Sequence, residues 1–169
     1  MEFQVGDKVV YPSQGVSVVE SITTQEFLGE ELQCYNLRLL STNSRLMVPV
    51  TNSDRVGLRP LAEPDHVEEV MDRLRDQSAT GEGDWKDRYK ANLDRIKTGD
   101  LEAVVDVILC LTDVASRKSL SFRERKMFDH ARQLLVFEVA EVEDRPVEDV
   151  EEEIDRAIQV RQGEDAEAS

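Results

Sequence analysis

The sole tryptophan of this 169-residue chain, Trp85, lies in a short segment whose residue types suit nucleic-acid binding. The segment reads WKDRYKANLDRIK, and residues 86–97 hold five basic side chains against two acidic ones. Basic side chains neutralise phosphates, and an apolar wedge between them can enter the minor groove and partly unstack a base step. This pattern predicts DNA contacts by Trp85, Lys86, Arg88, Lys90, Arg95 and Lys97.

The same segment has a second interpretation, in which Trp85 is only structural. If residues 85–97 form a helix, an inward stripe is made of Tyr89, Leu93 and Ile96. Trp85 would then fold back as a hydrophobic staple against Tyr89 or the preceding helix. The outer face would carry Lys86, Lys90 and Lys97, with Arg88 and Arg95 near its margins. Residue types alone leave both interpretations open.

A second basic run, RKSLSFRERK at residues 117–126, holds five basic side chains against Glu124. It could extend a phosphate-binding surface if it folds beside Trp85, and otherwise it is a solvated helix face. The candidate cations are Arg123, Arg125 and Lys126. The formal net charge is −15, yet residues 138–169 hold thirteen acids against three arginines. The charge is therefore polarised along the chain, so net acidity does not exclude a local DNA contact.

The first sixty residues have the pattern of a β module. Short β-branched runs are expected to form strands near residues 8–12, 16–22, 33–40 and 45–50. Turn-rich separators fall at residues 28–30 and 41–44. Four or five short strands without an intervening helix predict a small, strongly bent antiparallel sheet or barrel.

After Pro60 the apolar residues recur with helical period. Helices are expected over residues 64–75, 85–97, from 101 onward, 121–143 and 146–160. Gly99 and Asp100 predict a C-cap followed by a new N-cap, and Ser121 with Glu124 predicts a capping box. The fold class is therefore α+β, with a β module at 1–61 and an all-α domain at 64–160. Residues 161–169 are expected to be a disordered acidic tail.

The chain shows no pattern of an enzyme, a metal protein or a membrane protein. No apolar run reaches the ~18 residues of a membrane span, and no signal peptide is visible. Cys34 and Cys110 lie in apolar patterns and are interpreted as reduced core residues, consistent with the cytoplasm. His66 and His130 lack partners at catalytic or metal-ligand spacing, and no glycine-rich phosphate loop occurs. We expect no catalytic residue, metal or cofactor.

Four separated motifs together resemble the CarD/CdnL family of bacterial transcription factors that bind RNA polymerase. They are VGDKVVYPSQGVSVVESI, RLMVPV followed by VGLRPL, WKDRYKANLDRIKTGD, and LSFRERKMFDHARQLLVFEVA. The resemblance covers roughly residues 1–160. It implies a Tudor-like (SH3-like) module that docks on the polymerase β subunit, as a related module of the transcription-repair coupling factor does. It also implies a helical domain that contacts promoter DNA in the minor groove at the upstream edge of the bubble and stabilises the open complex.

The resemblance also implies roles for particular residues. Trp85 matches the family's wedge, and Arg88 and Lys90 match phosphate contacts. Asp87 departs from relatives that carry a basic residue there, and its carboxylate would repel phosphate. The polymerase-binding residues implied are Gln25, Arg45, Met47 and Pro49, with Met47 as the apolar contact and Arg45 as a rim charge. Some relatives carry arginine where this chain has Gln25 and Met47.

Two other functions stay open at this point. In one, the β module docks on polymerase and the helical domain recruits a further protein instead of DNA. In the other, the helical domain only adds stability and Trp85 is buried. For the leading hypothesis we expect a monomeric cytoplasmic protein, associated with the nucleoid through RNA polymerase, with no membrane partner.

Overall fold

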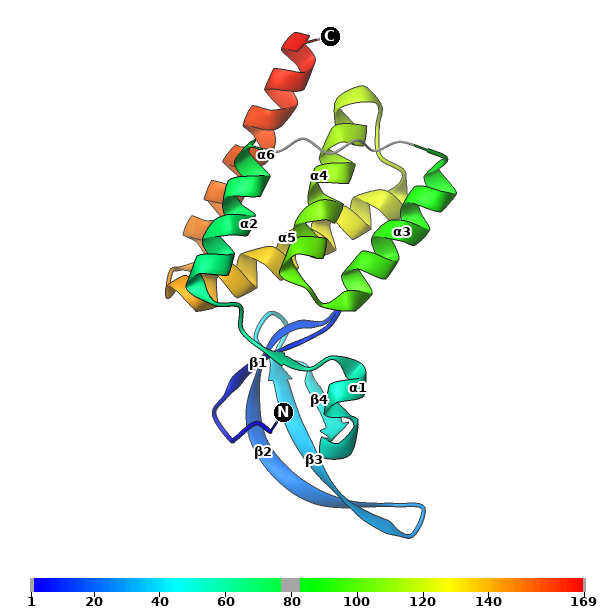
Figure 1. Ribbon diagram of the computed structural model, residues 1–169, viewed down its shortest axis with the longest axis vertical. Coiled ribbons are helices and arrows are strands. Elements are labelled where there is room, and N and C mark those ends of the chain that lie inside the picture. Colours follow the sequence, from blue (N-terminus) through cyan, green and yellow to red (C-terminus); the bar gives the residue numbers. More distant parts are fainter. Residues whose placement is uncertain (1, 77–82, 169) are drawn as a thin grey trace. The chain divides into compact units, whose positions relative to one another are not determined.

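The computed structural model describes residues 2–76 and 83–168, and it divides the chain into two compact units. The first unit, Met1–Leu61, is built on an antiparallel sheet, and the second, Ala62–Ser169, is helical (Figure 1). The predicted α+β class, with a β module followed by helices, is confirmed.

The first unit holds five antiparallel strands in the order β4-β3-β2-β1-β5. A single-turn helical stretch, η1 at Val50–Asn52 and α1 at Ser53–Val56, connects β4 to β5. Gly57 ends α1 with φ of 81°, and an added Cβ would lie 3.1 Å from Pro12 Cγ, so glycine suits this turn. The strands are β1 Lys8–Tyr11, β2 Gly15–Phe27, β3 Glu30–Leu39, β4 Arg45–Pro49 and β5 Arg59–Pro60.

One face of β3 carries the core of this unit. Tyr35 and Leu37 are buried there against apolar side chains of the neighbouring strands. The Tyr35 hydroxyl accepts a hydrogen bond from the backbone N–H of Phe3 at 3.0 Å, and the two rings meet edge to face with centroids 5.8 Å apart. A buried tyrosine needs a partner for its hydroxyl, and this bond also fixes the N-terminal segment on the sheet.

The hairpin of β2 and β3 is longer than the sequence pattern predicted. β2 was expected to end near residue 22 and β3 to begin near 33, but the strands reach Phe27 and Glu30. Leu28 and Gly29 form the turn with φ of 50° and 84°, as two-residue hairpin turns with positive φ require. The added pairs are mostly polar and exposed, so no hydrophobic alternation marks them. The two-residue strand β5 was also missed.

The second unit consists of five helices, and its helix ends largely follow local capping signals. Gly99 ends α3 with φ of 76°, and the Asp100 side chain accepts a hydrogen bond from the Glu102 backbone N–H at 3.1 Å, which confirms the predicted C-cap and N-cap. The bounds are α2 Pro64–Asp76, α3 Trp85–Thr98, α4 Leu101–Arg117, α5 Phe122–Glu143 and α6 Val147–Ala168.

The helix α4 is the centre of the helical core. It is in contact with each of the other four helices (Figure 1), and it is apolar around most of its circumference, as expected of a buried helix. Val105, Val107, Ile108 and Leu111 are fully buried. Burying each such side chain contributes about 1.5–3 kcal/mol, so α4 supplies much of this unit's stability.

The helix α6 differs from its predicted extent. We expected it to end near residue 160 with disorder beyond, but the helix continues through Ala168. The helix is therefore longer than predicted, and the disorder expected for residues 161–169 stays a prediction. Ser169 lies outside the described residues.

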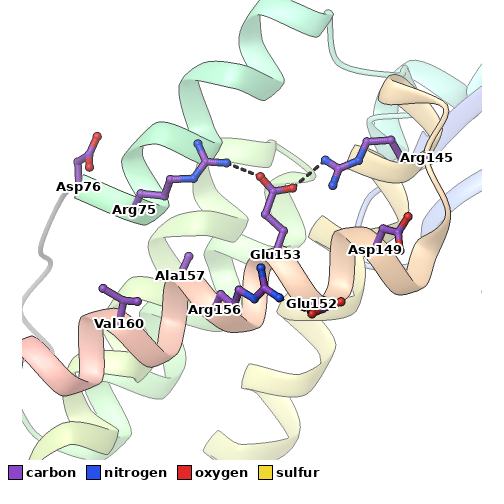
Figure 2. Close-up of a pocket in the computed structure, with 9 residues that line it drawn as sticks. All are labelled: Arg75, Asp76, Arg145, Asp149, Glu152, Glu153, Arg156, Ala157 and Val160. Carbon is purple, nitrogen blue, oxygen red and sulfur yellow. Dashed lines mark hydrogen bonds and ion pairs between the residues drawn. The ribbon is translucent and has the colours of Figure 1, made fainter.

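Ion pairs attach α6 to its neighbours. Glu153 accepts from Arg75 of α2 at 2.5 Å and from Arg145 at 2.7 Å (Figure 2), and Arg132 of α5 forms two bonds to Asp155 at 2.6 and 2.7 Å. Burial raises the pKa of the Glu153 carboxyl, but the bonds and charges of Arg145 and Arg75 outweigh burial, so this pKa lies below its ordinary value of 4.5.

The lowered pKa of Glu153 predicts how its contribution depends on pH. A depressed folded-state pKa stabilises the fold above the ordinary value and loses that effect as pH falls through the folded pKa. At pH 7 the Glu153→Gln variant should therefore melt a few degrees below the wild type, and the difference should shrink as the pH falls below 4.5 through the lowered folded-state pKa. Thermal melts across this range test it, with Glu152→Gln as control because Glu152 pairs only with Arg156 on the surface. A difference that persists at low pH would contradict the account.

Candidate nucleic-acid interface

Trp85 is the first residue of α3, and its indole is partly open to solvent. Its side chain is 41% exposed, and Nζ of Lys86 lies 5.9 Å from the ring centroid. Tyr89 and Leu93 follow on the same stripe of the helix and are half-buried against the helical core. The stripe thus emerges from the core toward its N-terminal end, so the alternative in which Trp85 is fully buried is wrong. The staple against Tyr89 stays a prediction.

The innermost row of α3 was not the predicted one. The buried residues are Arg88, Asn92 and Ile96, of which only Ile96 was expected to face inward. Asn92 donates from Nδ2 to Sγ of Cys110 at 3.5 Å and accepts at Oδ1 from Nη1 of Arg95 at 2.6 Å. Arg95 is therefore half-buried and already bonded, which limits what it can offer to a phosphate.

Arg88 is buried and corrects the sequence-based expectation of a phosphate contact. Its Nε and Nη2 donate to the two carboxylate oxygens of Glu124 at 2.8 and 2.9 Å, and Nη1 donates to the carbonyl oxygen of Gly83 at 3.2 Å. The two side chains are 3% and 2% exposed. The hydrogen bond with Glu124 raises the pKa of Arg88 further, so the guanidinium stays charged at any working pH.

The capping box predicted at the start of α5 forms only by half. Oγ of Ser121 accepts from the backbone N–H of Glu124 at 3.2 Å, as predicted. The Glu124 carboxylate does not return to the cap, because both of its oxygens bond Arg88 of α3. A residue 36 positions away in the sequence thus overrides a local capping preference.

The remaining predicted cations are exposed. Lys86, Lys90 and Lys97 lie along the outer side of α3, and within residues 2–76 and 83–168 none of them forms an ion pair. Asp87 is exposed on the same first turn. In α5 the exposed cations are Arg123, Arg125 and Lys126.

Sequence reasoning missed Phe122, the first residue of α5. Its side chain is 74% exposed, and Nζ of Lys126 lies 4.6 Å from the ring centroid, a cation–π contact. A signal was available: Asp84-Trp85-Lys86 and Ser121-Phe122-Arg123 share the order cap residue, aromatic, cation. Both aromatics thus stand at helix N-termini, where the helix dipole favours phosphate.

The Arg88–Glu124 ion pair brings these two helix starts together. Arg88 is three residues after Trp85, and Glu124 is two residues after Phe122, so both aromatics lie at the same end of the helical unit. This arrangement suits nucleic-acid binding, in which the cations contact the phosphate backbone and the exposed aromatic rings stack on bases or wedge between them.

The residues predicted to bind polymerase share one face of the sheet. In the register, Met47 of β4 pairs with Asn36 of β3, Asn36 with Ser21 of β2, and Pro49 with Cys34. Side chains alternate along a strand and paired residues share a face, so one face carries Gln25, Arg45, Met47 and Pro49. It is opposite the face of Tyr35 and Leu37. Met47 is 47% exposed, and β4 is an edge strand.

A hollow of about 760 Å³ lies elsewhere in the helical unit (Figure 2). Arg75, Arg145, Glu153, Glu152 and Arg156 contribute to its lining, and these charges pair with one another. Among the described residues, no cluster of three or more His, Cys, Asp or Glu could hold a metal ion. No helix in the described part of the chain is both long and apolar enough to cross a bilayer.

Two family models match the two units of the chain. The model described as "CarD-like/TRCF RID domain" matches residues 3–62, and the model described as "CarD, C-terminal domain" matches residues 69–155. The chain therefore belongs to the CarD/CdnL family of transcription factors, and its first unit is of the RNA polymerase-interacting type. A curated relative is the putative transcription factor YdeB of Bacillus subtilis (strain 168), 33% identical over 137 residues that cover 81% of this chain and 90% of the relative.

Two solved structures of N-terminal domains are also similar. The 72-residue N-terminal domain of Myxococcus xanthus CarD is 36% identical, with 35% of this chain and 79% of that chain covered and a TM-score of 0.32. CdnLNt from the same organism is 42% identical, with 36% and 84% covered and a TM-score of 0.31.

The partial exposure of Trp85 predicts its fluorescence. Because Trp85 is the only tryptophan, native emission should be shifted to the red of a buried indole and should be quenched readily by acrylamide. Quenching should remain weaker than in the urea-unfolded protein, which serves as the fully exposed control. A blue-shifted emission that resists quenching would mean that the indole is packed inside.

Proposed function

We propose that this protein docks on the β subunit of RNA polymerase through its sheet unit and stabilises the promoter open complex by contacting DNA at the upstream edge of the bubble. The observation that carries the proposal is the exposed indole of Trp85, beside Lys86, at the start of a helix whose first turn is locked to α5. Membership of a family of polymerase-interacting transcription factors supports it.

The docking surface is the sheet face defined by Gln25, Arg45, Met47 and Pro49. Met47 offers an exposed apolar contact on an edge strand, and Arg45 is a charge at its rim that is weakly paired with Glu20 at 3.4 Å. Buried apolar contacts tend to decide affinity, and rim charges mainly affect the rate of association. Met47 should therefore matter more for affinity than Arg45.

The DNA-contacting surface consists of Trp85 and Phe122 with the cations around them. Trp85 is the wedge in the minor groove, and Phe122 is a second apolar contact beside it. Arg88 is excluded because its guanidinium is buried and bonded to Glu124 and Gly83, and Arg95 is a marginal contact because it is bonded to Asn92. The phosphate contacts proposed are Lys86, Lys90, Lys97, Arg123, Arg125 and Lys126.

The physical mechanism is a shift of population between closed and open promoter complexes. The wedge contacts DNA only where the strands separate, so the factor binds the open complex more tightly than the closed one. It can bias the equilibrium only by that difference in affinity. A difference of about 1.4 kcal/mol already changes the ratio tenfold.

The net charge of −15 requires recruitment by polymerase. The protein alone should bind DNA poorly, because its overall field repels phosphate. Docking on polymerase raises the effective concentration of the helical unit at the promoter, so weak local contacts suffice. We propose that the protein acts in the cytoplasm as a monomer.

A second candidate function is an adaptor that binds polymerase and recruits another protein through its helical unit. Two observations favour it: Asp87 is exposed beside Trp85, and α6 carries nine acidic residues against two arginines. The two functions differ in their footprints. DNA contact changes protection at the upstream bubble edge, and adaptor function leaves it unchanged.

The proposal predicts distinct effects of variants on each surface. Trp85→Ala should shorten the open-complex lifetime about tenfold while leaving polymerase binding intact, and Phe122→Ala should have a smaller effect in the same direction. Met47→Asp should lose activity by failing to bind polymerase. Lifetimes are measured by competitor challenge on a model promoter, and polymerase affinity is measured separately.

Val160→Ala is the matched control, because Val160 is an exposed apolar residue of α6 outside the proposed surface. Its lifetime should equal that of the wild type. An unchanged lifetime for Trp85→Ala would remove the wedge function, and lost polymerase binding in the same variant would show that the two surfaces are not separate.

A further inference from the structure

We propose that Arg88 and Glu124 are positioning residues, and that their buried ion pair sets the direction in which Trp85 projects. The inference rests on the proposed function for its consequence at the promoter. The structural part, in which the pair controls the position of Trp85, does not depend on that function and is measured separately by the fluorescence of Trp85.

The guanidinium of Arg88 connects three segments of the chain. Arg88 belongs to α3, its Nε and Nη2 hold Glu124 in the first turn of α5, and its Nη1 holds the carbonyl of Gly83. Gly83 is two residues before Trp85, and Arg88 is three residues after it. The backbone on both sides of the indole is therefore anchored to the same side chain.

The start of α3 lacks the local device that fixes other helix starts in this unit. Asp100 and Ser121 cap α4 and α5 through their side chains, but the N-cap residue of α3, Asp84, makes no such bond. Uncapped helix starts fray. Gly83 precedes it with φ of 95°, a conformation that glycine adopts without strain. The bond from Arg88 to Gly83 is the attachment that compensates for the missing cap.

Stability alone does not explain a buried ion pair here. Two charges must lose their water, and replacing such a pair by apolar side chains of similar volume is often neutral or stabilising. An apolar pair cannot reproduce the three directed hydrogen bonds of the planar guanidinium, two to the carboxylate and one to the carbonyl. The pair therefore fixes the position of the first turn of α3. A wedge residue such as Trp85 must be held in a defined position to insert between bases.

The test replaces the pair by apolar residues in the variant R88M/E124L. We expect cooperative melting near the wild-type temperature, with faster local motion of Trp85. Steady-state anisotropy of Trp85 should fall and acrylamide quenching should rise. In the promoter assay the open-complex lifetime should shorten about threefold to tenfold, the loss expected of a contact group left loosely placed.

The control is R132M/D155L, which removes the doubly bonded pair between α5 and α6 away from the α3 start. It should leave the anisotropy of Trp85 and the open-complex lifetime unchanged. If R88M/E124L fails to fold, R88K serves instead, since lysine keeps a positive charge opposite Glu124 but lacks the planar guanidinium that bonds both carboxylate oxygens and the Gly83 carbonyl. It should give a smaller change of anisotropy in the same direction.

The outcomes separate this inference from the proposed function. Wild-type anisotropy and lifetime in a folded R88M/E124L, or wild-type anisotropy in R88K, would overturn the positioning role even if Trp85→Ala shortens the lifetime. If Trp85→Ala leaves the lifetime unchanged, the proposed function fails, and a fall in anisotropy in R88M/E124L still supports control of Trp85 by the pair.

Discussion

The ion pair between Arg88 and Glu124 is the interaction on which the functional end of the helical unit depends. It crosses from α3 to α5, both partners are almost fully buried, and each lies within the first turn or so of its helix. Removing one partner of such a pair leaves an uncompensated buried charge, at about 3–5 kcal/mol. The starts of α3 and α5 therefore cannot move independently. Trp85 and Phe122 are the first residues of these helices, so their positions relative to each other are restricted as well. The apolar core around α4 supplies stability, and we propose that the ion pair sets the direction in which Trp85 projects.

The charge distribution is compatible with the DNA contact that we propose for this acidic protein. Most of the acidic excess lies in the C-terminal part of the chain, where arginines of α2 and α5 pair with carboxylates of α6. At the starts of α3 and α5 the exposed cations outnumber the exposed acids Asp84 and Asp87, so the local charge there is positive. These cations are Lys86, Lys90, Arg123, Arg125 and Lys126. Long-range repulsion of DNA remains, and in the proposed function docking through the sheet overcomes it by proximity. The proposed DNA contact would then depend on the presence of polymerase.

The sequence alone predicted the features that arise locally. Hydrophobic period located the helices, and Gly99, Asp100 and Ser121 marked helix ends because capping is a short-range effect. The burial of Arg88 was not predictable in this way, since it depends on a partner 36 residues away. The same ion pair withdraws the Glu124 carboxylate from its capping box. Phe122 was overlooked because one aromatic in a basic run resembles a core residue. The outer part of the β2–β3 hairpin was missed because its polar pairs carry no alternation.

The central claim is that the start of α3 touches promoter DNA in the polymerase complex. The most direct measurement places a photo-crosslinking amino acid at position 85, and separately at position 160, in complexes with polymerase and a promoter. The account predicts a crosslink from position 85 to DNA at the upstream edge of the bubble and none from position 160. Crosslinks from position 85 to protein alone would contradict the claim and favour the adaptor.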